Sequence, residues 1–100
     1  SFSFHGYLPI EERKRDAKIQ QLEGESARHD RTQLFIEAPY RNNSLFSAII
    51  SKAGSETRLC IATDLTLPTE QIQTRTIREW KKSGAPELNN RPAIFLLYAR

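Results

Sequence analysis

The chain has 100 residues, of which 38% are hydrophobic and 27% are charged, and its formal net charge is +3. This size and balance are typical of one soluble domain with a single core, and the mildly basic charge leaves the nature of a partner open. No apolar run approaches the roughly 20 residues of a membrane-spanning helix, and the chain does not open with a signal-like segment, so we expect a cytoplasmic protein without a membrane partner.

The first elements predicted are a strand and a helix. Residues 1–8 alternate apolar and polar side chains, as a half-buried strand does. Pro9 is suited to the first position of a helix, whose pattern then continues to Leu22. Residues 23–31 lack apolar periodicity, and we predict a loop there.

A second strand and a second helix follow. Residues 32–37 are apolar on both faces, which indicates a strand in the interior of a sheet. The apolar residues beyond them recur every three or four positions, as in an amphipathic helix. We expect Asn42 or Asn43 to cap this helix and Gly54 to end it.

The last part of the chain predicts three strands and one short helix. Residues 58–63 and 93–98 are apolar strands, whereas residues 70–75 alternate like an antiparallel or edge strand. Thr76 and Glu79 have the spacing of a capping box for the short helix. This order predicts an α/β fold in which three helices pack on a mixed sheet of about five strands.

Several kinds of chemistry have no support in the sequence. Cys60 is the only cysteine, and His5 and His29 are the only histidines. Neither a disulfide within the chain nor a metal site is therefore expected. The sequence also has no glycine-rich phosphate loop and no catalytic triad, so we expect no autonomous enzyme and leave the catalytic residues unassigned.

Polar residues instead gather after predicted strands, where open α/β sheets commonly hold ligands. Residues 37–41 follow one strand, residues 64–66 follow another, and Pro92 precedes the last. Two interpretations of the first group stay open. Glu37 and Arg41 form either part of a binding site or a surface ion pair.

The order of several short motifs resembles the C-terminal half of the tetrapyrrole methylases, nearest the branch that methylates a cytidine ribose in small-subunit ribosomal RNA. The family segments Gly-Phe-Leu-Pro, Tyr-Glu-Ser-Pro-His-Arg, Glu-Leu-Thr-Lys and Arg-Gly-Thr-Leu are matched in turn by residues 6–9, 36–41, 64–67 and 74–77. The final apolar strand also corresponds. The lysine of the third motif is Leu67 here and the glycine of the fourth is Arg75, departures that bear on the acceptor more than on the cofactor.

The resemblance implies a two-lobed, homodimeric methyltransferase that binds S-adenosylmethionine between its lobes. In that case residues 1–100 are a single domain, and the N-terminal lobe with the glycine-rich cofactor motif is expected upstream of Ser1. The positions that the family implies for the cofactor are Glu37, Ala38, Leu65, Pro92 and Ala93. Those considered for an RNA substrate are Arg13, Lys14, Arg15, Tyr40 and Arg41.

Other functions stay open at this point. The basic side chains of the first helix fit RNA phosphates, and they equally fit a solvated helix face in which Glu11 pairs with Arg15. A porphyrin or corrin methylase is the alternative within the enzyme class, although its Tyr-Met-Gly motif is replaced by residues 36–38. A non-enzymatic RNA- or protein-binding module is the alternative outside that class.

Overall fold

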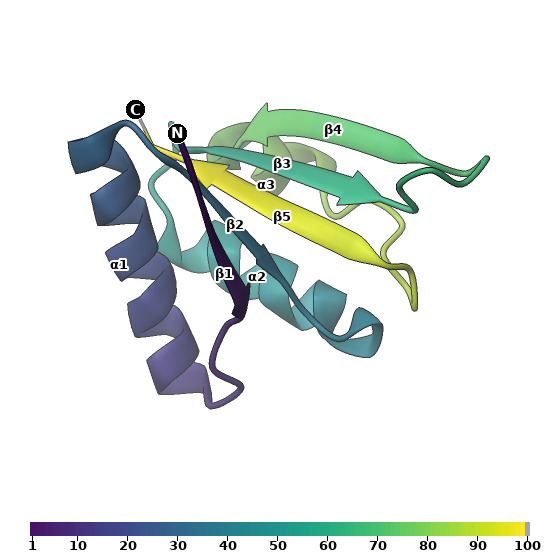
Figure 1. Ribbon diagram of the computed structural model, residues 1–100, viewed down its shortest axis with the longest axis horizontal. Helices are drawn as coiled ribbons and strands as arrows, with labels where there is room; N and C mark the ends of the chain where they lie inside the picture. Colours follow the sequence, from purple (N-terminus) through teal and green to yellow (C-terminus); the bar gives the residue numbers. More distant parts are fainter. Residues whose placement is uncertain (100) are drawn as a thin grey trace.

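The computed structural model describes residues 1–99, which form one five-stranded sheet with three α-helices (Figure 1). The strands are β1 (Phe2–Tyr7), β2 (Thr32–Ile36), β3 (Arg58–Thr63), β4 (Gln71–Thr76) and β5 (Ala93–Tyr98). The helices are α1 (Glu12–His29), α2 (Asn42–Lys52) and α3 (Ile77–Ser83), and a 3-10 turn, η1 (Pro39–Arg41), precedes α2. The predicted order of strands and helices is confirmed, and so is the fold class.

The sheet has the strand order β1-β2-β5-β3-β4. β1 is parallel to β2, and the other three neighbouring pairs are antiparallel, so the sheet is mixed as predicted. β2 is an interior strand and β4 an edge strand, again as their patterns indicated. Because β2 and β3 run in the same direction and β5 runs against both, their C-terminal ends meet the start of β5 at one end of the sheet.

All three helices pack on one face of the sheet. The rings of Phe35 and Phe95 stack there with centroids 6.1 Å apart. The indole Nε1 of Trp80 donates to the carbonyl oxygen of Leu59 at 2.8 Å, so its polar atom is satisfied inside the core. Other buried members of this core are Ile19, Leu22, Leu45, Phe46, Ile49, Ile61, Ile77 and Leu97. No helix in residues 1–99 is long and apolar enough to cross a bilayer.

The opposite face of the sheet is apolar, and no helix of the described chain covers it. Residues paired directly across strands share a face, which groups these side chains into two rows. One row holds Phe4, Leu34, Leu96 and Cys60, and the next holds Ile36, Ile94, Ala62 and Ile72. Phe4 and Ile72, at the two edges, are 65% and 59% exposed. Apolar surface of this extent is typical of an interaction site.

Helix α1 is longer than the sequence predicted, because the expected loop continues the helix to His29. Polar side chains in this last part are anchored by tertiary hydrogen bonds. Ser26 is fully buried and its hydroxyl accepts from the amide of Ala99 at 2.9 Å, while Glu23 Oε2 accepts from the amide of Gly54 at 2.7 Å. The loop prediction was wrong because such polar anchors leave no apolar periodicity.

The starts of two helices also differ from the predictions. α1 begins at Glu12 rather than at Pro9, because a bend at residues 10–11 turns the chain out of β1 first. Neither Asn42 nor Asn43 caps α2. The side chain of Asn42 instead donates to the carbonyl oxygen of Arg91 at 2.7 Å, a long-range contact that the sequence could not reveal.

The capping box of α3 is confirmed. The Thr76 hydroxyl accepts from the amide of Glu79 at 3.2 Å, and Glu79 Oε1 accepts from the amide of Thr76 at 2.8 Å. At the other end of the helix, Gly84 has a φ of 76°, a backbone conformation that favours glycine. Local rules therefore fix both ends of this helix.

Candidate functional site

A cavity of about 320 Å³ lies where β2, β3 and β5 meet at one end of the sheet. Four of the five residues expected to contact a cofactor line it, namely Glu37, Leu65, Pro92 and Ala93. The uncovered sheet face supplies part of its apolar lining through Ile36, Ala62 and Ile94. A volume and lining of this kind suit a small ligand with a flat apolar part.

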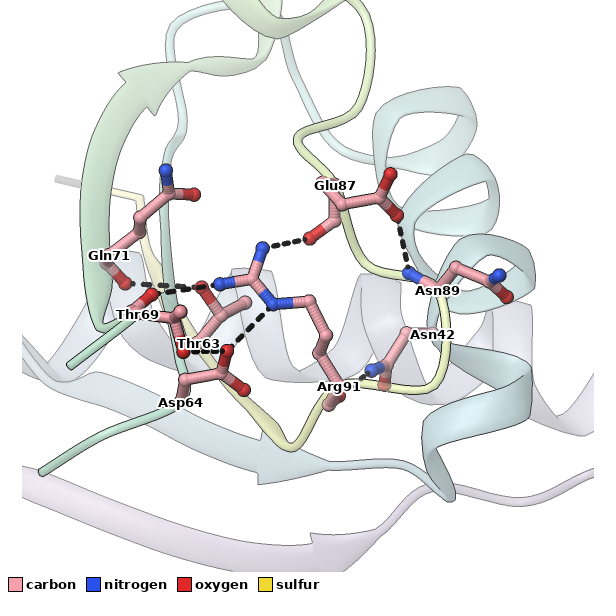
Figure 2. Close-up of polar contacts among 8 residues, drawn as sticks. All are labelled: Asn42, Thr63, Asp64, Thr69, Gln71, Glu87, Asn89 and Arg91. Carbon is pink, nitrogen blue, oxygen red and sulfur yellow. Dashed lines mark hydrogen bonds and ion pairs between the residues drawn. The ribbon is translucent and has the colours of Figure 1, made fainter. Parts of the chain in front are cut away.

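An ion pair between Asp64 and Arg91 joins the two loops beside this cavity (Figure 2). Arg91 Nε donates to Asp64 Oδ2 at 2.9 Å, and the Thr69 hydroxyl donates to the same oxygen at 2.7 Å. The other guanidinium nitrogens donate to the carbonyl oxygens of Thr69 and Glu87, at 2.9 Å and 2.8 Å. One side chain therefore ties the β3–β4 loop to the segment that leads into β5.

The backbone around this ion pair adopts the left-handed conformation at three positions. Asp64, Thr66 and Asn90 have φ values of 51°, 69° and 55°. Such values are uncommon for residues other than glycine, and for a β-branched residue like Thr66 they indicate strain. Strained residues of this kind cluster at functional sites, where surrounding contacts hold them in place.

A second cavity, of about 500 Å³, lies between the β1–α1 turn and η1. Its apolar wall comes from Tyr7, Leu8, Pro9 and Ile10, and its opposite wall from Glu37, Ala38 and Arg41. Ala38, the fifth residue expected at the cofactor, lines this cavity instead of the first. Glu37 lines both cavities and is therefore their common wall.

The ion pair between Glu37 and Arg41 that the simpler interpretation expected is present at 3.3 Å, but Glu37 is 7% exposed and therefore is not a surface carboxylate. Its Oε1 accepts from the amide of Ala38 at 2.8 Å and from Arg41 Nε at 3.3 Å. Arg41 lies over the Tyr40 ring, with its guanidinium carbon 4.6 Å from the ring centroid, and its Nη1 donates to the Tyr40 hydroxyl. Tyr40 is itself exposed, and the pair presents a flat cationic surface beside the second cavity.

The basic residues at the start of α1 are not equivalent. Arg13 and Lys14 are exposed, and Lys14 forms a long ion pair with Glu11 at 3.9 Å. Arg15 pairs with Asp16 at 3.4 Å, so the expected pair between Glu11 and Arg15 is absent from the described residues. Arg15 also lines a third, polar cavity between α1 and α2, away from the other two residues of its group.

Sequence reasoning missed part of the site. Asp64 was noted at a strand end, but its partner Arg91 is 27 residues away, and only its position before Pro92 gave any indication. Tyr7 and Ile10 were interpreted as strand and helix residues, yet both line the second cavity. Within residues 1–99, no group of three or more histidine, cysteine, aspartate or glutamate side chains could hold a metal ion.

The chain is similar to part of two curated proteins, each named ribosomal RNA small subunit methyltransferase I. It is 32% identical to the one from Vibrio cholerae serotype O1 over 79 residues, and 30% identical to the one from Mesorhizobium japonicum over 78 residues. These matches cover 79% and 78% of the chain, but 26% and 25% of the relatives. The chain thus spans about a quarter of their length. No family model matches it.

Three solved methyltransferases share its fold. They are CobJ, with a TM-score of 0.57, the cobalt precorrin-4 methyltransferase CbiF, with 0.58, and uroporphyrin-III C-methyltransferase from Thermus thermophilus in complex with S-adenosylhomocysteine, with 0.55. Each match covers 98% of the chain, and 41%, 40% and 41% of the respective structure, at sequence identities of 14%, 14% and 10%. The five-stranded sheet and its helices are therefore one part of a larger known architecture.

The Asp64–Arg91 ion pair predicts a pH-dependent stability. The hydrogen bond from Thr69, followed by the interaction with Arg91, lowers the pKa of Asp64 below its ordinary value of 3.8. The resulting stabilisation is fully present above pH 3.8 and is lost as the pH falls through the lowered pKa. Asp64→Asn should therefore reduce the free energy of unfolding at pH 7, and its difference from the wild type should shrink below pH 3.8.

Urea denaturation of the two proteins between pH 7 and pH 2.5 measures this difference. Glu56→Gln is a suitable control, because the pair between Glu56 and Arg78 is exposed on both sides. A difference between wild type and Asp64→Asn that stays constant over this range would contradict the assignment.

Proposed function

We propose that this chain belongs to the tetrapyrrole methylase family, that it is one lobe of an S-adenosylmethionine-dependent methyltransferase, and that it forms one wall of the cofactor site. The observation that carries this proposal is the strand-end cavity, which gathers four of the five residues that the family resemblance implied. Those residues come from three segments that are far apart in the sequence. Their meeting in one cavity of ligand size follows from the sheet topology.

The lining of the cavity fits the proposed cofactor. An adenine ring needs an apolar slot, with backbone groups at its edge to satisfy its polar atoms. Leu65, Ala93 and Ile94 supply apolar surface, and Pro92 lines the same cavity. The uroporphyrin-III C-methyltransferase of the same fold is complexed with S-adenosylhomocysteine, the demethylated form of this cofactor.

S-adenosylmethionine, when bound, supplies a methyl group on a positively charged sulfur. The role of this lobe is then to position the cofactor and the acceptor, because alignment of the reacting groups accounts for much of the rate acceleration that a protein provides. The Asp64–Arg91 ion pair serves that role by fixing the two loops on either side of the cavity.

We propose RNA as the methyl acceptor, since both curated relatives are named for ribosomal RNA. Arg13 and Lys14 are exposed and can contact phosphates at the surface, although Lys14 also forms a long ion pair with Glu11, whereas Arg15 is half-buried beside Asp16 and contributes less. The Tyr40–Arg41 pair offers an aromatic ring and a guanidinium for stacking on a nucleotide base. A porphyrin or corrin acceptor is the second candidate, favoured by the fold shared with CobJ and CbiF.

We propose in addition that a glycine-rich lobe lies upstream, that the full-length protein is a homodimer, and that it is cytoplasmic. The chain covers about a quarter of its curated relatives, which leaves room for a second lobe in a protein of their length. The row of Phe4, Leu34, Leu96 and Cys60 on the uncovered sheet face is uncharged and does not line the strand-end cavity, so a second copy can bury this row without leaving a charge in it unpaired. Sedimentation velocity of the full-length protein measures the oligomeric state, and a monomer at all concentrations would contradict the dimer.

Filling the strand-end cavity should weaken cofactor binding. Leu67 lines the cavity and is 51% exposed, so Leu67→Trp adds volume there without entering the core. We expect the dissociation constant of the full-length protein for S-adenosylmethionine to rise at least about tenfold, a loss of roughly 1.4 kcal/mol, in calorimetric titration. Ala27→Trp, on the exposed side of α1, is the matched control. If both variants bind S-adenosylmethionine as tightly as the wild type, the cofactor does not bind in the strand-end cavity.

Removing two charges from α1 should reduce the salt dependence of RNA binding. In the double variant Arg13→Gln and Lys14→Gln, two phosphate contacts are lost, and the slope of log K against log salt should fall by about 1.4 for single-stranded RNA. Filter binding at several salt concentrations measures the slope. The control changes Lys81 and Lys82, which are exposed on α3, to Gln. If both double variants lower the slope equally, the basic residues of α1 form a solvated helix face and not an RNA-binding site.

A further inference from the structure

The two cavities share one side chain, Glu37, and only one of its two carboxylate oxygens accepts hydrogen bonds from residues 1–99. Both hydrogen bonds that Glu37 accepts go to Oε1, from the amide of Ala38 and from Arg41 Nε. Oε2 accepts no hydrogen bond from residues 1–99, and this oxygen is not fully buried. It is therefore accessible to a ligand or to water at the wall that the two cavities share.

We infer that the second cavity receives the methyl acceptor and that Glu37 accepts the proton which the acceptor loses. This inference rests on the proposed function, in which the first cavity holds S-adenosylmethionine. Glu37 then stands between the methyl donor and the nucleophile, which is where a general base must be.

The second cavity fits a single nucleotide of an RNA segment. Tyr7, Pro9 and Ile10 form its apolar wall, and Tyr7 and Ile10 are each 65% exposed. Gly6 makes this wall possible, because its φ of 65° lies within the irregularity of β1 between Phe4 and Tyr7. A base can stack on such a wall.

The charges around the cavity favour an anionic acceptor. Arg41 lies on the opposite wall, and its guanidinium can reach the nucleotide phosphate or stack on the base. Glu11 and Glu12 come directly after Ile10, and Arg13 and Lys14 lie exposed one to two residues beyond them at the start of α1, where they can hold neighbouring phosphates.

The proposed step balances in atoms and charge. A lone pair of the acceptor hydroxyl or amine forms the new bond to the methyl carbon, and the carbon–sulfur bond breaks with its electron pair passing to sulfur. The acceptor proton passes to Glu37 Oε2. The positive sulfonium and the negative carboxylate thereby become a neutral thioether and a neutral carboxylic acid, and water then removes the proton. Arg41 and the amide of Ala38 hold Oε1, so they fix the orientation of Oε2.

Glu37→Gln in the full-length protein tests this inference. The Gln amide oxygen can accept the two hydrogen bonds that Oε1 accepts now, so the local structure should be preserved while the base is lost. We expect the single-turnover rate of methyl transfer to small-subunit ribosomal RNA to fall at least about 100-fold, a typical size for the loss of a general base. Because Gln keeps the size of the side chain that lines the first cavity, the dissociation constant for S-adenosylmethionine should rise by a much smaller factor than the rate falls.

Two further variants separate catalysis from structure and from binding. Glu37→Asp keeps a carboxylate and should recover part of the rate lost in Glu37→Gln. Ile10→Trp fills the second cavity from its exposed edge and should raise the KM for RNA without changing the affinity for S-adenosylmethionine.

These measurements distinguish a failure of the role inferred for Glu37 from a failure of the proposed function. A wild-type protein that binds no S-adenosylmethionine would overturn the proposed function itself. If the wild type binds the cofactor, an unchanged rate in Glu37→Gln would overturn the role as a base, and a large loss of cofactor affinity would make Glu37 a cofactor ligand instead. Methylation of a uroporphyrin-type ring in place of RNA would overturn the acceptor class.

Discussion

The ion pair between Asp64 and Arg91 is the interaction on which the candidate site depends. It joins two loops that are 27 residues apart, and the amide of Asp64 also donates to the carbonyl oxygen of Pro92 at 3.0 Å. These contacts hold the positions of Asp64 and Pro92, and the amide of Thr66 is held in addition by Glu70 Oε1 at 2.8 Å. Partly buried ion pairs of this kind, with further hydrogen bonds to the same groups, fix geometry more than they add stability.

The sheet topology explains why two cavities meet at Glu37. β2 ends between β1 and β5, so the residue after it faces the β3 and β5 loops on one side and the β1–α1 turn on the other. A methyl donor in the strand-end cavity and a methyl acceptor in the second cavity would be separated only by the Glu37 side chain. Such an arrangement needs no reactive cysteine or metal cluster, which agrees with a sequence that gives no catalytic motif.

Much of the fold was predictable because it follows local rules. The alternation of residues 70–75 indicated an edge strand, and Thr76 and Glu79 marked the start of α3 correctly. Two of the failures, the loop predicted at residues 23–31 and the cap predicted for α2, have one physical cause, which is that polar side chains form hydrogen bonds with residues far away in the sequence. Ser26 is buried against the amide of Ala99, and Asn42 bonds to Arg91 instead of capping its own helix.

The same limit applies to the site. Glu37, Leu65, Pro92 and Ala93 were identified through the family resemblance, and the structure brings them to one cavity. Arg91 and Tyr7 were not identified, because their positions depend on which loops meet in three dimensions and not on any local pattern. The apolar rows of the uncovered sheet face could likewise be grouped only once the strand register was known.

The central claim is that the cavity between the β3–β4 loop and the start of β5 holds the adenosyl group. A crystal structure of the full-length protein with S-adenosylhomocysteine tests it most directly. The account predicts the adenine ring against Leu65, Pro92 and Ala93, with the Asp64–Arg91 ion pair intact. A cofactor bound without contact to these residues, or in the polar cavity between α1 and α2, would contradict it.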